Sequence, residues 1–318
     1  MTPPQYLSAR PMKLPNFFLG GPPKAGTTSL HQYLRQHPQV YMNPIKEPTF
    51  FGTADLRSRD DFVATVERER AALRTYLEGP QLRPAQFWVT EWDQYVAMFR
   101  NVRDQIAIGE ASVSYFWQPS AATAIRAKLP GARLIFVLRN PVDRLVPWYM
   151  ISLRREPRLT FHAWLKRTMD GGIDRGPAVD AGRFATHLQR FFDHFPREQV
   201  RIYLHESLSA DAGAVVRDML AFLEVDPDYP IDVSYRHNES VVPRFPVLDR
   251  LRRRIIGNRS VISWLPAPAH RALREVYNRG RKDFLIGPDD RRMLNDYYRD
   301  EILRTADLIG RDLSAWLR

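Results

Sequence analysis

Residues 17–30 read FFLGGPPKAGTTSL and predict a strand, a glycine-rich turn and the start of a helix. The leading apolar run is typical of a buried strand, and Leu30, Tyr33 and Leu34 repeat at the spacing of one helix face. Backbone N–H groups in such a turn, with the positive end of a helix dipole behind them, form a cradle for an anion. The segment therefore predicts an anion site, although such a turn can also simply join a strand to a helix.

The lysine of this turn stands in an unusual place. The phosphate-binding P-loop reads G-x-x-x-x-G-K-[ST]. Here Gly21 and Gly26 keep that spacing, but Thr27 replaces the lysine and Lys24 lies inside the loop. Three consecutive residues after Gly26 carry hydroxyls that can donate to an anion: Thr27, Thr28 and Ser29.

A second apolar run, residues 133–138, gives the strongest strand signal and is followed by RNPVDR at 139–144. Ligands of open α/β sheets bind beyond the carboxyl ends of the strands. Arg139 at such an end suits a phosphate held by two hydrogen bonds, whereas nucleotide hydrolases place an aspartate there to organise Mg²⁺. The alternative is a surface arginine opening a helix, with Pro141 in its first turn.

The remaining pattern predicts an α/β fold with a P-loop NTPase-like central parallel sheet and helices on both faces. Besides the first strand, at 16–20, strands are expected at 40–42, 106–108 and 200–204. Helices are expected at 183–192, 215–223 and 293–303, with 308–317 as an extension of the last. We expect one domain over residues 1–318, with an N-terminal extension at 1–15 and a basic segment at 240–285.

The composition of the 318 residues is that of a globular protein, with 44% hydrophobic and 26% charged residues. The absence of cysteine excludes disulfides, thiolate metal sites and a cysteine nucleophile. No apolar run is long enough to span a membrane, and residues 1–16 lack the apolar core of a signal peptide, so we expect a soluble, cytoplasmic protein.

Most of the net charge of +11 lies in one region. Between Arg244 and Lys282, eleven lysines and arginines accompany two acidic residues. A segment with this charge could bind a polyanion or nucleic acid, could contact a membrane surface, or could simply be a face exposed to solvent.

Taken together, residues 23–30 and 139–144 resemble the two nucleotide-binding motifs of sulfotransferases that use 3′-phosphoadenosine 5′-phosphosulfate (PAPS). The first is similar to their 5′-phosphosulfate loop and the second to their 3′-phosphate motif. Further similar segments follow in family order at 46–51, 109–116, 181–188 and 308–316. The resemblance is greatest to the carbohydrate type, the heparan sulfate sulfotransferases and their bacterial relatives.

This resemblance implies transfer of a sulfuryl group from PAPS, which leaves adenosine 3′,5′-bisphosphate, without a metal. It implies that Lys24 stabilises the leaving group and that Glu47 is the base, although Glu47 could instead pair with Lys46 or cap a turn. The acceptor would be a hydroxyl or amine of a small molecule or glycan, with an anionic one among the options, and not a nucleic acid. The residues expected to bind PAPS are Lys24, Ala25, Gly26, Thr27, Thr28, Ser29, Arg139 and Arg244.

The chain departs from the family pattern at two positions. Pro147 stands where the family has a serine that binds the 3′-phosphate, and a proline there should kink the helix or delay its start. Ala111 stands where many members have lysine. We therefore expect the 3′-phosphate to rest on Arg139 and a second group, for which the basic residues 252–254 are candidates.

Two other functions compete with this one. A nucleotide kinase or NTPase with a degenerate P-loop would require Mg²⁺, and a non-catalytic nucleic-acid binder would use the basic segment. The eight histidines, which are rival bases, show no zinc-binding spacing.

Overall fold

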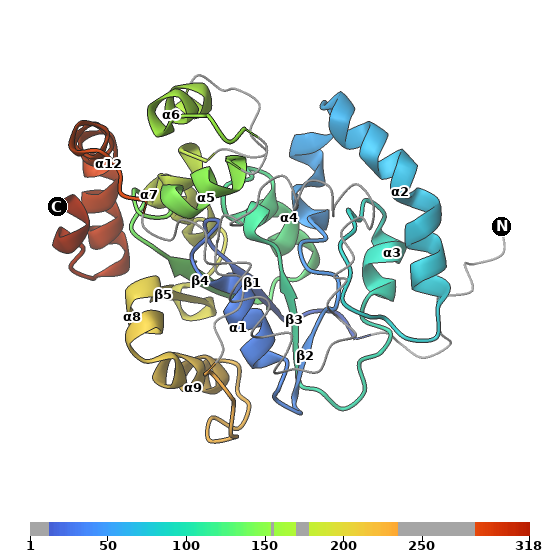
Figure 1. Ribbon diagram of the computed structural model, residues 1–318. Coiled ribbons are helices and arrows are strands. Elements are labelled where there is room, and N and C mark those ends of the chain that lie inside the picture. The colour runs from blue at the N-terminus through green and yellow to red at the C-terminus, as the bar shows by residue number, and fades with distance from the viewer. Residues whose placement is uncertain (1–12, 154–155, 170–177, 235–283) are drawn as a thin grey trace, which may run out of the picture. The chain divides into compact units, whose positions relative to one another are not determined.

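The computed structural model describes residues 13–153, 156–169, 178–234 and 284–318 (Figure 1). The described residues form two compact units. The first holds residues 13–139, 183–234 and 301–313, and the second holds 140–153, 156–169, 178–182, 284–300 and 314–318. The prediction of one domain over 1–318 stays a prediction.

The first unit is built on a five-stranded sheet in which every pair of neighbours is parallel. The strand order is β2-β3-β1-β4-β5, with β1 at Phe17–Gly20, β2 at Val40–Met42, β3 at Ala107–Ala111, β4 at Arg133–Leu138 and β5 at Val200–Leu204. This confirms the predicted parallel α/β sheet, with β3 shifted toward the Gly-Glu of residues 109–110.

Helices of the first unit cover both faces of this sheet. Leu19 and Val137 join a core with α1 (Thr27–Leu34) and α9 (Ala212–Phe222) on one face. On the other face the Phe136 ring lies 4.6 Å from Phe191 of α7 (Phe184–Phe192) and 5.5 Å from Phe116, which ends the 3₁₀ turn η2 (Val113–Phe116). Burial on both faces explains why these strands are apolar throughout rather than alternating.

The register of the sheet brings the predicted motifs to one edge. β1 lies between β3 and β4, with Gly20 opposite Phe136 and Leu19 opposite Ala111. Because the strands are parallel, the segments that follow β1, β3 and β4 begin side by side.

Six further elements complete the described part of the first unit. They are η1 (Phe50–Leu56), α2 (Asp60–Glu78), α3 (Trp92–Ala97), α4 (Ala121–Lys128), η4 (Arg197–Gln199) and α8 (His205–Ala210). The second unit contains α5 (Leu145–Ser152), α6 (Phe161–Met169) and η3 (Asp180–Gly182), together with η5 (Ser314–Leu317) and the first part of α12 (Pro288–Ile309).

A buried arginine and an aromatic cluster organise the second unit. The Arg144 side chain is fully buried and donates to the backbone carbonyl of Ala178, and the Tyr298 hydroxyl donates to the carbonyl of Val179 at 2.6 Å. The rings of Tyr149 and Phe161 lie 5.3 Å apart, edge to face. Thus the Arg144 side chain links the RNPVDR segment to the backbone of Ala178 and Val179.

Two helix predictions need correction or refinement. α12 ends at Ile309 and is not extended to residue 317, because Gly310 adopts a left-handed conformation with φ of 64°. Pro147 lies in the first turn of α5, which begins at Leu145. Its missing N–H costs little there, so the proline delays the helix rather than kinking it.

Replacing Gly21 by alanine is expected to lower the melting temperature clearly. Gly21 has a φ of 129°, and a Cβ there would lie 2.3 Å from the carbonyl oxygen of Val137 in β4. The strain and the clash should together cost about 2–3 kcal/mol. Thermal unfolding of Gly21→Ala measures the effect. Gly131→Ala is the control, because a Cβ on Gly131 would meet nothing within 4 Å. Equal melting temperatures would contradict the close approach of the turn to β4.

Candidate active site

The turn after β1 holds three residues with positive φ. These are Gly21 at 129°, Lys24 at 72° and Gly26 at 109°. A lysine in this conformation is strained, and such strain concentrates at functional sites. Gly26 caps α1, and its carbonyl accepts from the N–H of Ser29 at 3.0 Å. The turn thus leads directly into a helix N-terminus, the arrangement expected of an anion cradle.

The structure brings Arg139 and Lys24 together. Arg139 follows the last residue of β4, and its Nη1 donates to the backbone carbonyl of Lys24 at 3.2 Å. Both residues are half-buried. The adjacency of β1 and β4 therefore places two cations at one edge of the sheet, as the two motifs predicted.

A third segment joins this edge after β2. Glu47 and Thr49 adopt positive φ values of 63° and 59°. The Lys46 Nζ lies 2.9 Å from the Glu47 carboxylate and donates to the Thr28 hydroxyl at 3.0 Å. Lys46 therefore links Glu47 to the start of α1, and the ion pair considered from the sequence is present in the structure.

The link through Lys46 leaves the Thr28 hydroxyl able to act on a ligand. A hydroxyl that accepts from an ammonium group keeps its own proton for donation. Thr28 is half-buried, whereas its neighbours Thr27 and Ser29 are buried. In the sequence Lys46 is only the neighbour of Glu47, because its contact with Thr28, 18 residues away, depends on the tertiary structure.

A buried carboxyl supports the Glu47 segment from β3. The Glu110 side chain is fully buried and accepts from the hydroxyls of Tyr95 and Ser112, both at 2.6 Å. The Ser112 hydroxyl oxygen in turn accepts from the N–H of Thr49 at 3.3 Å. The Thr49 hydroxyl donates to the Glu47 carbonyl at 3.1 Å.

This chain of hydrogen bonds fixes the backbone conformation of the two residues with positive φ, Glu47 and Thr49. Glu110 was not identified as a functional residue from the sequence. Its signal was the Gly-Glu of residues 109–110 inside an otherwise apolar strand. Burial raises the pKa of Glu110 from 4.5 to about 7, while hydrogen bonds from the Ser112, Tyr95 and Tyr115 hydroxyls limit the rise.

Glu110→Gln is expected to change how stability depends on pH. The wild-type carboxyl ionises near pH 4.5 in the unfolded chain but near pH 7 in the folded one. Its stabilisation is therefore complete below pH 4.5 and is lost as pH rises through 7, by up to about 3 kcal/mol. Glutamine keeps the shape and does not titrate.

Urea unfolding of both proteins across this pH range measures the effect. The free energy of unfolding of the wild type should fall relative to that of Glu110→Gln as pH rises. Glu198→Gln, at an exposed carboxylate in η4, is the control. Parallel stability curves for wild type and Glu110→Gln would contradict the assignment.

The described histidines take different positions. His31 is buried in α1 and contacts the Asn43 carbonyl at 3.1 Å, and burial lowers its pKa to about 4. His187 is buried in α7 against Phe116, with the rings 5.5 Å apart, in a packing role. His205 begins α8 and lies beside the turn after β1. A Cβ added to Gly26 of that turn would be 3.7 Å from the His205 ring.

Arg244 and the basic residues 252–254 lie outside the described residues. Among the residues that the structure does describe, no group of three or more His, Cys, Asp or Glu side chains is placed to hold a metal ion. Within the same ranges, no helix combines the length and the apolar character needed to cross a bilayer.

Comparison with known proteins gives a consistent result. The family model described as "Sulfotransferase family" matches residues 15–229. A crystal structure of a sulfotransferase from Alicyclobacillus acidocaldarius has a TM-score of 0.68 and 29% identity, covering 96% of this chain and 100% of that chain.

Two curated relatives are bifunctional heparan sulfate N-deacetylase/N-sulfotransferases. N-deacetylase/N-sulfotransferase 3 of Homo sapiens is 23% identical to this chain, and the matched region covers 96% of this chain and 31% of the relative. N-deacetylase/N-sulfotransferase 1 of Caenorhabditis briggsae is 24% identical, and the matched region covers 74% of this chain and 26% of the relative. The chain thus spans about a quarter to a third of the length of these relatives.

Proposed function

The chain belongs to the sulfotransferase family. We propose that it transfers a sulfuryl group from PAPS to a hydroxyl or amine of a carbohydrate or glycan-like small molecule. One observation carries the proposal. Three segments at the same edge of the sheet bring together Lys24, Arg139 and the Lys46–Glu47 pair.

The chemistry of these side chains fits a nucleotide with phosphates at two positions. Lys24, Arg139 and the Thr28 hydroxyl are donors suited to phosphate and sulfate oxygens. Lys24 and the N–H groups that open α1 would hold the 5′-phosphosulfate end, and Arg139 the 3′-phosphate. With Ala25, Gly26, Thr27 and Ser29 shaping the turn, these residues form the proposed PAPS site.

The bond that breaks joins sulfur to a phosphate oxygen, and the bond that forms joins sulfur to the acceptor atom. Lys24 neutralises the charge that develops on the departing phosphate oxygen. Glu47 takes the proton from the acceptor, while Lys46 fixes the orientation of the carboxylate. When bound, PAPS supplies the activated sulfuryl group.

The relatives' names describe N-sulfotransfer on heparan sulfate. An amine is therefore included beside a hydroxyl among the proposed acceptors. A glycan acceptor is proposed for this chain on that likeness and on the resemblance of residues 46–51 to the carbohydrate-type motif.

A thermal-shift titration followed by a transfer assay tests the proposal. Adenosine 3′,5′-bisphosphate at about 100 times its Kd should stabilise the protein by about 2.7 kcal/mol. ³⁵S-labelled PAPS in EDTA should then label acceptors from a panel of oligosaccharides, amines and phenols. A shift produced only by ATP with Mg²⁺, without labelled product, would contradict the proposal and favour a nucleotide kinase or NTPase.

A further inference from the structure

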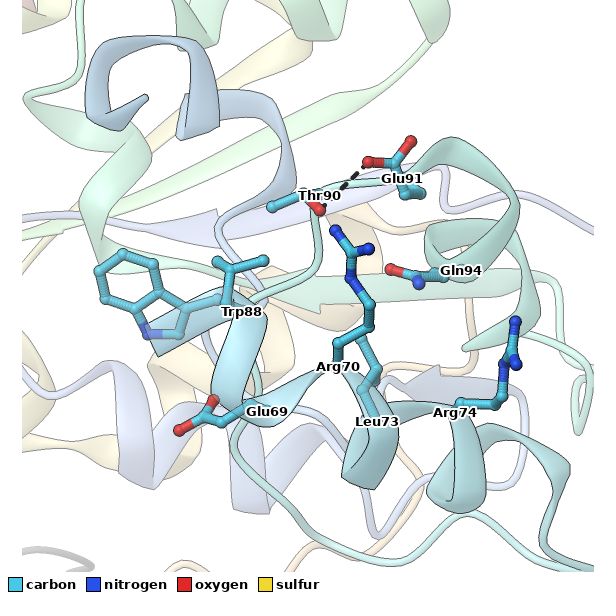
Figure 2. A pocket seen from close by; sticks show the side chains of 9 residues that line it. Glu69, Arg70, Leu73, Arg74, Trp88, Thr90, Glu91 and Gln94 are labelled. Carbon is cyan, nitrogen blue, oxygen red and sulfur yellow. Dashed lines mark hydrogen bonds between the residues drawn. The ribbon is translucent and has the colours of Figure 1, made fainter. Parts of the chain in front are cut away.

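A hollow of about 280 Å³ lies in the first unit, lined by none of the residues assigned to PAPS (Figure 2). One wall is a face of α2 that includes Val66, Arg70 and Leu73, spaced as residues on one side of a helix. The other wall is formed by Trp88, Thr90 and Glu91, together with Gln94 of α3. Its volume lies just below the range of about 300–1,000 Å³ that is usual for ligand pockets, a size that suits a single ring.

The second wall is bonded to the segment that carries the proposed base. The Lys46 N–H donates to the Ala85 carbonyl at 3.3 Å, and the Val89 N–H donates to the Pro48 carbonyl at 3.0 Å. Residues 85–89 therefore run beside residues 44–48 at about the spacing of neighbouring strands, roughly 4.8 Å. The backbone that carries Trp88 is therefore hydrogen-bonded to the segment that carries Glu47.

The side chains that line the hollow suit a hydroxyl-bearing ring. Figure 2 shows the Arg70 guanidinium lying between Thr90 and Gln94. Together these three groups offer donors and acceptors for neighbouring hydroxyls. Trp88 adds an aromatic surface, and its indole packs on Phe62 with the rings 4.5 Å apart, which fixes its position.

The charges around the hollow balance. Arg70 and Arg74 are accompanied by Glu69 and Glu91, and the Arg70 guanidinium also donates to the Glu67 carboxylate at 2.7 Å. An anionic ligand would meet carboxylates as well as guanidinium groups, whereas an uncharged ring can bond to both.

We propose that this hollow is a subsite for an uncharged sugar ring of the acceptor, next to the unit that receives the sulfuryl group. The assignment to the acceptor rests on the proposed function, whereas sugar binding itself does not. The sequence left open an anionic acceptor, whereas this proposal places an uncharged sugar unit of the acceptor in the hollow.

Saturation-transfer NMR of the whole protein with methyl β-glucopyranoside tests the proposal. We expect saturable binding in the millimolar range, as is usual for so small a ligand. Sodium glucuronate, which has a similar ring and a negative charge, should bind more weakly. No saturable signal for the glucoside, or binding of glucuronate that equals or exceeds it, would overturn the proposal.

Variants locate the binding. Arg70→Ala and Gln94→Ala should each weaken binding of the glucoside at least about fivefold, the effect of one lost hydrogen bond. Arg57→Ala changes an exposed arginine that does not line the hollow and should leave binding unchanged. Glucoside binding that survives both Arg70→Ala and Gln94→Ala would overturn the site. Trp88→Ala should abolish binding, with a thermal melt to verify that the protein folds.

The same titration separates this proposal from the proposed function. Lys24→Ala should bind the glucoside as well as the wild type. If the protein binds the glucoside but neither binds adenosine 3′,5′-bisphosphate nor transfers sulfate, the proposed function fails and the sugar site stands. If transfer occurs and the glucoside does not bind, only the subsite fails.

Discussion

Lys24→Ala is expected to lower kcat at least about a thousandfold, a loss of about 4 kcal/mol of transition-state stabilisation. Charge grows on the phosphate oxygen as sulfur leaves it, and Lys24 is the cation that the turn after β1 carries. Water entering in its place would have to reorient to stabilise the same charge. Single-turnover transfer of ³⁵S from PAPS measures the effect.

The substitution should leave the fold intact. The Arg139 guanidinium bonds to the backbone carbonyl of Lys24, which alanine retains. The positive φ of 72° strains lysine and alanine alike, and Lys24→Gly, which relieves that strain, should be equally inactive. Lys166→Ala, at an exposed lysine of α6, is the control.

Two outcomes would bear against this role. Turnover of Lys24→Ala within tenfold of the wild type would mean that another group stabilises the leaving oxygen. If Lys24→Ala loses both its activity and its binding of adenosine 3′,5′-bisphosphate, Lys24 contributes to the affinity for the nucleotide rather than to stabilisation of the transition state.

The strands and the two cationic segments were predictable from the sequence, because they depend on local patterns. Buried parallel strands are continuous apolar runs, and β1 and β4 each end directly in a motif. The proximity of Lys24 and Arg139 then followed from a general property of parallel sheets.

Contacts between distant segments could not be predicted in this way. The bond from Lys46 to Thr28 depends on how the chain returns after β2. Glu110 gains its role only when Tyr95 and Ser112 enclose it. α2 was not anticipated, because only Phe62, Leu73 and Leu77 of its 19 residues are buried and they leave a weak periodic signal.

Glu47→Gln is expected to slow single-turnover transfer about a thousandfold, within the range of general base catalysis. Glutamine keeps the size of the side chain and can still contact Lys46, but it cannot take a proton from the acceptor. Binding of adenosine 3′,5′-bisphosphate should stay close to that of the wild type. Glu156→Gln, which removes another paired carboxylate, is the control.

The pH dependence separates a base from a positioning residue. If Glu47 is the base, raising the pH to ionise the acceptor should restore part of the rate of Glu47→Gln, because less of the reaction then depends on proton removal. If Glu47 only orients Lys46 through their 2.9 Å contact, Lys46→Ala and Glu47→Gln should lose rate equally at every pH. A wild-type single-turnover rate for Glu47→Gln would place the base elsewhere, with His205 beside the turn as the next residue to change.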